Sequence, residues 1–207
     1  SSNDAKNVAL SIAAVQSQSE AGAFDIANLP MVSYPQRLDA ESLSEIPALQ
    51  MHVLGGILRA KVFADGQYGD EKVQSIAFAD ENTPMAGAFK LDLTGLSDEA
   101  SLIVTGLASR TAKTQLSIPY AVPSSQASAK DIYMILAPGT YDGTLSVTTE
   151  KAVYTQPFQC EMKRNACYDA SINLSTAARE SIDGWNGEGT AEAPYQVATA
   201  EDLQRLI

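Results

Sequence analysis

Short runs in which apolar and polar residues alternate recur along most of the chain. Residues 88–93 place Phe89, Leu91 and Leu93 on one face, and residues 57–63 alternate with Arg59 and Lys61 on their polar face. Because successive side chains of a strand point to opposite faces, such runs predict half-buried β-strands. Similar or shorter strand-like runs are found at 8–12, 28–35, 49–53, 73–78, 102–104, 115–118, 144–148, 152–155 and 167–174.

One run, residues 132–137, is apolar throughout and is too short for a helix. Its β-branched and aromatic residues predict a strand buried on both faces, which Pro138-Gly139 ends. A turn is expected at Tyr141-Asp142-Gly143, before the next strand begins. We expect this central strand to organise the core, with the following side chains buried: Ile57, Ile76, Phe89, Ile132, Met134 and Leu136.

Many short strands at a spacing of about ten residues predict an all-β sandwich. Outside this pattern, residues 39–45 are expected to form at most a turn of helix, and 176–183 are compatible with a helix. A glycine-rich stretch at 184–190 follows, and Thr199 begins a second helical pattern. We therefore expect a sandwich domain at 1–175 and, at 176–207, a linker with the truncated start of a following module.

Composition narrows the classes of partner. The 207 residues carry a formal net charge of -11, which argues against nucleic acid and against docking on anionic lipid. No window approaches the roughly 18 apolar residues of a membrane span, so no direct membrane insertion is expected. The N-terminus shows no signal peptide.

The chain has two cysteines, Cys160 and Cys167, whose spacing suits neither a zinc knuckle nor a thioredoxin-type pair. Two free, buried thiols are the favoured interpretation. A disulfide across a hairpin at 163–165 is the alternative.

No residue pattern predicts catalysis. We expect no catalytic, cofactor-binding or metal-binding residues in this chain. His52 is the only histidine and lies in a strand-like run, so a structural or solvent-facing role is expected. The acidic pairs Asp80-Glu81 and Asp98-Glu99 fit turns. The glycine-rich 184–189 lacks the features of a phosphate loop. Asp65-Gly66 and Asp142-Gly143 fit ordinary turns better than calcium loops.

The order of several motifs resembles the fimbrillin-like surface proteins of Gram-negative, Bacteroides-type gut and oral anaerobes, which include type V pilus and Mfa-like subunits. The resemblance covers roughly residues 8–175. The motifs that carry it are Val15-Gln16-Ser17-Gln18, Leu29-Pro30-Met31-Val32, the run from Gly55 to Val62, the run from Val73 to Phe78, Met85-Ala86-Gly87-Ala88-Phe89, the run from Leu136 to Tyr141, and Lys163-Arg164-Asn165.

This resemblance implies an antiparallel, Greek-key, transthyretin-like sandwich that is exported as a lipoprotein to the outer membrane and cell surface. It also implies a role in fimbriae or adhesion, with other surface or pilus subunits, host proteins or glycans as partners, and no cofactor. The run from Gly184 to Thr190, followed by Pro194-Tyr195-Gln196-Val197, resembles the opening of a repeat module of long surface adhesins. We therefore expect a fragment of a longer precursor.

Two functions are expected to compete. The first is a non-enzymatic adhesion or fimbrial module that exchanges a strand, for which residues 8–34 are the candidate segment and Arg37 a candidate protease site. Residues 8–34 as permanent sandwich strands, and Arg37 as an exposed loop arginine, are the alternatives. The second function is a carbohydrate-binding accessory domain, for which Tyr133, Tyr141 and Tyr154 are the candidate contacts, although packing in the core is their expected use.

Overall fold

The computed structural model describes residues 7–33, 50–66, 71–92 and 106–182, together with residues 191, 194, 196 and 197. These residues form an all-β sandwich, as the alternating pattern predicts. Its strands are β1 (Asn7–Ile12), β2 (Val15–Gln18), β3 (Met31–Ser33), β4 (Met51–Val53), β5 (Gly56–Phe63), β6 (Lys72–Ala79), β7 (Gly87–Asp92), β8 (Thr111–Ala121), β9 (Asp131–Leu136), β10 (Gly139–Thr149), β11 (Ala152–Met162), β12 (Cys167–Asn173) and β13 (Ala178–Ser181). Two short 3-10 helices, η1 (Ile26–Asn28) and η4 (Gln126–Ser128), lie between strands.

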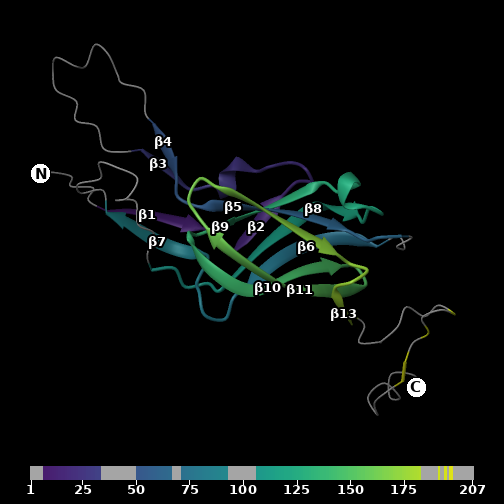
Figure 1. Cartoon of the computed structure of the whole chain (residues 1–207). Helices are drawn as coiled ribbons and strands as arrows, with labels where there is room; N and C mark the ends of the chain where they lie inside the picture. The colour runs from purple at the N-terminus through teal and green to yellow at the C-terminus, as the bar shows by residue number, and fades with distance from the viewer. Residues whose placement is uncertain are drawn as a thin grey trace, which may run out of the picture.

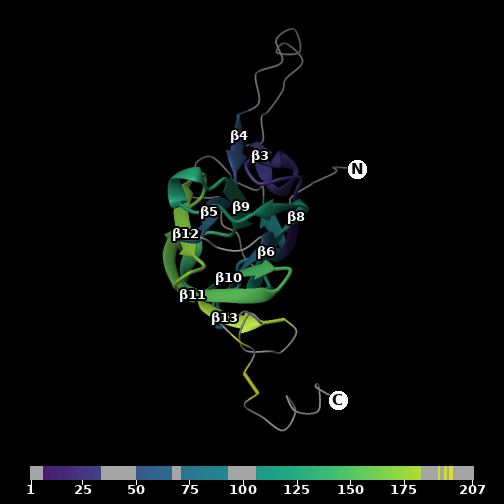
Figure 2. The same ribbon diagram turned by 90° about the vertical axis from the view of Figure 1, so that its right-hand side faces the viewer.

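Two sheets make the sandwich. A six-stranded sheet has the order β13-β11-β10-β6-β8-β2, and a three-stranded sheet has the order β12-β5-β9. Two further pairs, β1-β7 and β3-β4, form two-stranded ribbons near one end of the fold, whereas β13 lies near the other end (Figure 1). When the right-hand side of Figure 1 faces the viewer, the six-stranded sheet is seen to curve around the three-stranded sheet (Figure 2).

The sandwich is not wholly antiparallel, which corrects the arrangement implied by the resemblance. β2 pairs with β8 in parallel, and β12 pairs with β5 in parallel. Parallel neighbours require a long connection rather than a hairpin, so hairpin signals in the sequence could not reveal them. None of the described segments forms an apolar helix of membrane-spanning length.

The core is largely the one that the pattern predicts, with two exceptions. The run 132–137 was expected to be buried on both faces, but Tyr133 is partly exposed, because β9 is the edge strand of its sheet and is buried on both faces only from Met134 to Leu136. Ile132, Met134, Leu136 and Ile76 are fully buried, and Phe89 is 3% exposed. Ile57 was expected to be buried too, but it is only half-buried because it shares the face of Arg59. The side chains that β5 turns into the core are Leu58, Ala60 and Val62.

β10 continues through the turn that we expected at Tyr141-Asp142-Gly143. The strand starts at Gly139 and pairs with β11 on one side and β6 on the other. Gly143 allows this because a side chain there would collide with the β6 backbone: a Cβ would lie 2.1 Å from the carbonyl oxygen of Ala79. The glycine therefore serves close strand approach rather than a turn.

Two elements differ from the predicted organisation. β2 lies in a stretch where 8–12 was the only strand expected, and β13 lies where a helix was expected. β13 pairs with β11 at the edge of the six-stranded sheet, so the sandwich extends past the boundary placed at residue 175. The segments predicted at 39–45, 102–104 and from Thr199 onward lie outside the described residues.

Asp80 follows β6 and is a turn residue, as predicted, but its side chain is buried. Its Oδ1 accepts hydrogen bonds from the backbone N–H groups of Asn82 (2.7 Å) and Thr83 (3.0 Å), and its Oδ2 accepts one from Asp142 (2.8 Å). The bond from Asp142 lowers the pKa of Asp80 most, and those from Asn82 and Thr83 lower it further. One carboxylate thus ties the loop after β6 to β10.

We expect the Asp80→Asn variant to lose stability in a pH-dependent way. At pH 7 its free energy of unfolding should fall by about 2 kcal/mol, because an amide offers only one acceptor oxygen for three backbone N–H donors. The folded pKa of Asp80 lies below its unfolded value of about 3.9, so the carboxylate stabilises the fold above that pH and stops doing so as the pH falls through the folded pKa. Urea denaturation between pH 7 and pH 2 should show the gap to wild type closing below about pH 4. A gap that stays constant, or an equal loss in the exposed control Glu161→Gln, would contradict this assignment.

Candidate functional site

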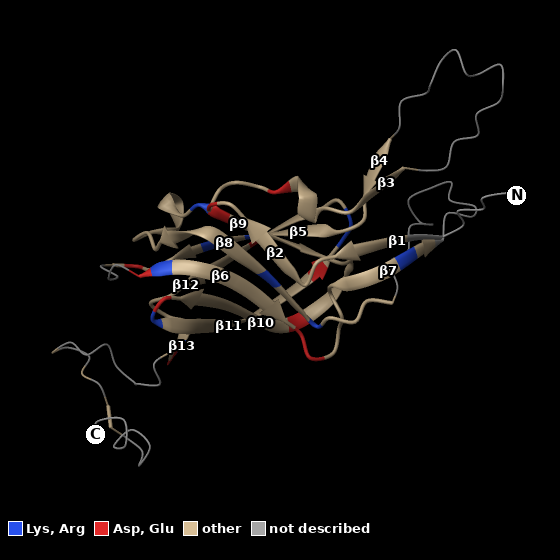
Figure 3. Cartoon of the chain, turned by 180° about the vertical axis from the view of Figure 1, so that it is seen from behind, with Lys and Arg blue, Asp and Glu red and all other residues tan. Residues whose placement is uncertain are grey.

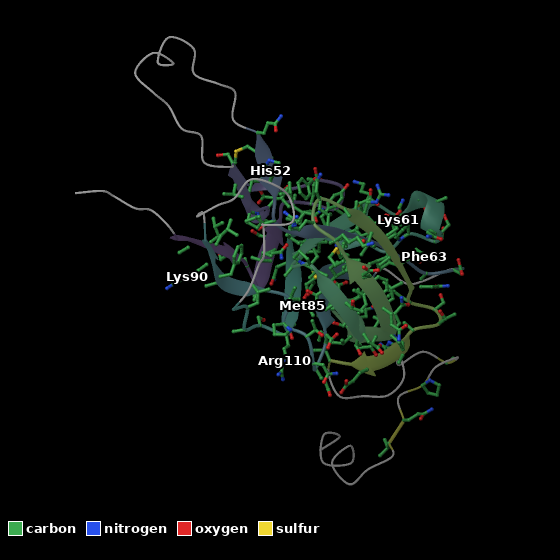
Figure 4. All side chains as sticks on the ribbon, turned by 60° about the vertical axis from the view of Figure 1, so that its left-hand side comes forward. His52, Lys61, Phe63, Met85, Lys90 and Arg110 are labelled. Carbon is green, nitrogen blue, oxygen red and sulfur yellow. The ribbon has the colours of Figure 1, made fainter. Side chains whose placement is uncertain are left out.

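The outer face of the three-stranded sheet gathers charged and aromatic side chains from all three of its strands. Alternation along β5 decides this, because the strand turns its small and aliphatic residues inward and leaves Arg59 and Lys61 on the other face. Strand register then sets the neighbours: Arg59 lies between Asp169 of β12 and Tyr133 of β9, and Lys61 lies opposite Asp131 of β9. Lys61 is labelled in Figure 4.

Arg59 and Asp169 form a two-pronged ion pair. Arg59 Nε donates to Asp169 Oδ1 at 2.6 Å, and Arg59 Nη2 donates to Asp169 Oδ2 at 3.0 Å. These bonds lower the pKa of Asp169 and raise that of Arg59. The side chains are 40% and 69% exposed, so the pair adds little stability, but its planar geometry fixes where both groups point.

Lys61, Asp131 and Tyr133 form a second polar group beside the first. Lys61 Nζ donates to the backbone carbonyl of Ala129 at 3.3 Å and lies 3.7 Å from Asp131 Oδ1. The Tyr133 hydroxyl donates to Asp131 Oδ2 at 3.4 Å. Burial of the ring raises the pKa of Tyr133 first, and the charge of Asp131 raises it further. The hydroxyl therefore remains a donor at neutral pH.

The segment before η1 adds an aromatic edge to this face. Phe24 packs against Tyr133 edge-to-face, with ring centroids 5.2 Å apart, and remains 40% exposed. Asp25 caps η1 by accepting from Ala27 N at 2.9 Å, and Asn28 Nδ2 donates to the carbonyl of Ser17 at 2.9 Å. The bond to Ser17 holds the segment against β2, and the contact between Phe24 and Tyr133 holds it against β9.

The free edge of β9 is closed by glutamine side chains instead of a strand. Gln16 Oε1 accepts from Ile135 N at 2.8 Å, and its Nε2 donates to Ile135 O at 2.7 Å. Gln18 repeats the pattern, accepting from Tyr133 N at 2.9 Å and donating to Asp131 O at 3.2 Å. Both glutamines are 2% exposed. Each primary amide thus imitates one residue of a paired strand.

Gln156 makes a similar bridge on the other side of the sandwich. It projects from β11, and its Nε2 donates to the backbone carbonyl of Ser171 in β12 at 2.7 Å. The two sheets are therefore joined along both sides of the three-stranded sheet by glutamine amides. The sequence does not reveal this role, because Gln16 and Gln18 stand out in it only as part of the resembling motif at 15–18.

The three tyrosines considered for glycan contact separate into two groups. Tyr141 and Tyr154 are core residues, 1% and 0% exposed, as the packing interpretation predicts. The Tyr141 hydroxyl donates to Ala137 O at 2.8 Å, and the Tyr154 hydroxyl donates to the buried carboxylate of Glu71 at 3.1 Å. Tyr133 is partly exposed and is the member of the three that lies on the outer face of the three-stranded sheet.

Both cysteines are free, as favoured, but they are not both buried. Cys160 of β11 is half-buried, and Cys167 of β12 is exposed. Burial raises the pKa of the Cys160 thiol. His52 is half-buried in β4, on the ribbon that leaves the sandwich, where Figure 4 labels it.

The structure describes some of the remaining predicted turns. Asp65 follows β5, and its Oδ2 accepts from Asn173 Nδ2 at 2.7 Å. Among the described residues no three His, Cys, Asp or Glu side chains converge as metal ligands would. Asp98-Glu99 and the glycine-rich 184–189 lie outside the described residues.

Comparisons with known proteins give a distant structural match. No family model matches the chain, and no curated protein matches it significantly. A similar solved structure is the crystal structure of a "putative cell adhesion protein" from Bacteroides ovatus, with a TM-score of 0.39 and 14% sequence identity. The match covers 73% of this chain and 48% of that one, so this chain spans about half of that protein's length.

Proposed function

We propose that this chain is a non-enzymatic adhesion or fimbrial structural module of the surface of a Gram-negative anaerobe, carried by an outer-membrane lipoprotein precursor. In this proposal it associates with like subunits by strand exchange, and β2 is the strand that exchanges. The observation that carries the proposal is the way in which β2 is held. It has a four-residue parallel ladder to β8, and it reaches β9 through the side chains of Gln16 and Gln18.

Hydrogen bonding favours such an exchange. The β9 edge presents a row of backbone donors and acceptors, at Asp131, Tyr133 and Ile135, and these already bind groups that are not a neighbouring backbone strand. A strand from a second subunit can supply the same bonds from its own backbone, so these β9 groups are paired again after the exchange.

Packing sets the requirement for the incoming strand. Ile12, at the end of β1, is fully buried and belongs to the core, so a departing segment removes an apolar side chain as well as the glutamines. A donor must therefore bring a comparable apolar residue about four positions before the part of its backbone that pairs with β9, as Ile12 precedes Gln16. Because Ile12 belongs to the core, the competing interpretation is that residues 8–34 are permanent strands of the sandwich that do not leave it.

We test the proposal with a chain lacking residues 1–37 and a fluorescent peptide of residues 8–34. We expect the shortened chain to be soluble but prone to aggregate, and the peptide to restore a monomer, as measured by size-exclusion chromatography and fluorescence anisotropy. A peptide carrying Gln16→Ala and Gln18→Ala should bind about tenfold more weakly or worse, since about 1.4 kcal/mol corresponds to a factor of ten.

Two outcomes would contradict strand exchange. A shortened chain that is unfolded and that the peptide does not rescue would show that 8–34 are permanent strands. A shortened chain that is folded and monomeric without peptide would show that the segment is dispensable. The matched control is a peptide with Ser17→Ala, whose side chain lies on the outer, exposed position of β2.

A further inference from the structure

The outer face of the three-stranded sheet has the composition of a small-ligand surface rather than of a charged patch. Its two cations, Arg59 and Lys61, lie beside two carboxylates, Asp169 and Asp131, so their charges cancel in neighbouring pairs. An ionic partner gains little there, because every charge already has its counter-ion. A neutral partner that carries both hydrogen-bond donors and acceptors does not rely on net charge, so these ion pairs do not weaken its binding.

The ion pairs leave hydrogen-bonding capacity for such a partner. A guanidinium carries five N–H donors, and Asp169 takes two of those on Arg59. A carboxylate has about four acceptor positions, and Arg59 fills two of those on Asp169. Donor and acceptor groups therefore lie side by side on this face, with Arg59 Nε 2.6 Å from Asp169 Oδ1 and Lys61 Nζ 3.7 Å from Asp131 Oδ1, and adjacent hydroxyls of one sugar can reach both kinds.

An aromatic edge borders these polar groups. Phe24 is 40% exposed and meets the ring of Tyr133 edge-to-face, so the two rings form an apolar corner beside Arg59. Small-ligand sites combine apolar or aromatic surface with a few fixed polar groups, and a sugar ring needs both because it has C–H faces and a hydroxyl rim. The outward residues of β10, by contrast, include the uncharged Thr144, Ser146 and Thr148, and most of the β10 ribbon is tan in Figure 3.

We propose that Phe24, Arg59, Tyr133 and Asp169 form a binding surface for neutral oligosaccharides on the outer face of the three-stranded sheet. Arg59 and Asp169 bind adjacent hydroxyls, Lys61 and the Tyr133 hydroxyl extend the contact along the sheet, and Phe24 with Tyr133 packs against the C–H face of one sugar. All four side chains are at least partly exposed, so a bound sugar keeps much of its surface in water and binding is weak at a single site. The proposal does not depend on strand exchange, because all of its residues are present in the intact, monomeric chain.

The test uses the intact chain and three neutral hexasaccharides: maltohexaose, cellohexaose and mannohexaose. We expect at least one to bind with a Kd of about 1 mM or below in calorimetry or NMR titration. Phe24→Ala and Arg59→Gln should each weaken that binding about fivefold or more, and Tyr133→Phe, which keeps the ring, should retain more affinity than Tyr133→Ala. The control variants Thr144→Ala and Gln159→Ala, on β10 and β11, should bind like wild type.

Three results would overturn the proposal. The first is no binding of any of the three hexasaccharides at concentrations well above 1 mM. The second is binding that Phe24→Ala and Arg59→Gln leave unchanged while both variants melt like wild type. The third is tighter binding of an acidic probe, hexagalacturonate, than of every neutral one, which would make charge the basis of recognition. These binding measurements use the intact chain, so their outcome can be interpreted even if the exchange experiment with the 8–34 peptide fails.

Discussion

Gly143→Ala is expected to be among the most damaging single substitutions in the described core. The added methyl carbon would lie 2.1 Å from the carbonyl oxygen of Ala79 and 2.9 Å from its carbonyl carbon, both of which belong to the β6 backbone. Neither atom can move aside as a side chain would, so β10 and β6 must separate. Overpacking usually costs about 1–3 kcal/mol, and here we expect about 3 kcal/mol or more because a backbone has to shift.

Urea denaturation of Gly143→Ala against the neighbouring Thr144→Ala measures this effect. Thr144 is exposed on the same strand, so its truncation should change the free energy of unfolding by less than about 0.5 kcal/mol. Equal stability of the two variants would show that β10 and β6 are not in close contact at Gly143. A variant that does not fold at all agrees with the prediction, and Gly143→Ser should then fail in the same way.

Leu136→Ala is expected to cost about 2–5 kcal/mol, the range for removing a buried leucine side chain and leaving a cavity. Leu136 is fully buried at the end of β9, opposite Gly56 of β5. The Met162 thioether covers Gly56, so the loss within this range depends on how far that flexible side chain moves into the cavity. Equilibrium unfolding in denaturant measures the difference.

Ile57→Ala is the matched comparison, because Ile57 is an apolar residue of the adjacent strand that is only half-buried. We expect it to cost about 1 kcal/mol, in proportion to the apolar area that it loses. A Leu136→Ala loss below about 0.5 kcal/mol would remove β9 from the core. An Ile57→Ala loss as large as that of Leu136→Ala would instead contradict the strand register that places Ile57 beside Arg59.

The core could be predicted from the sequence because burial in a strand leaves a local pattern. Met134 and Leu136 follow each other at the two-residue period of a strand, and both are buried. The same rule, applied with the wrong phase, put Ile57 in the core. Arg59 and Lys61 fix the phase of β5, and Ile57 shares their face, so the polar residues were the better guide to register.

β2 and the candidate site could not be predicted, because both depend on distant partners. Gln16 and Gln18 look like solvent-exposed residues in a polar stretch, and only the β9 backbone, more than a hundred residues away in the chain, makes their burial favourable. Asp169 reaches Arg59 across a parallel pairing for which no hairpin signal exists. Residues 178–181 are compatible with a helix in isolation, and only the pairing with β11 makes them the strand β13.

The position of the first and last described strands has a mechanical consequence. β1 and β13 lie near opposite ends of the sandwich and are each paired along their length with one neighbour, β7 and β11 (Figure 1). A pulling force applied to these two strands acts on both ladders, and its component along a strand loads the hydrogen bonds of that ladder together in shear. Under tension the four-residue ladder of β13 is shorter than the six-residue ladder of β1, and it is therefore the first expected to slip, leaving the rest of the sandwich intact as a force-bearing unit.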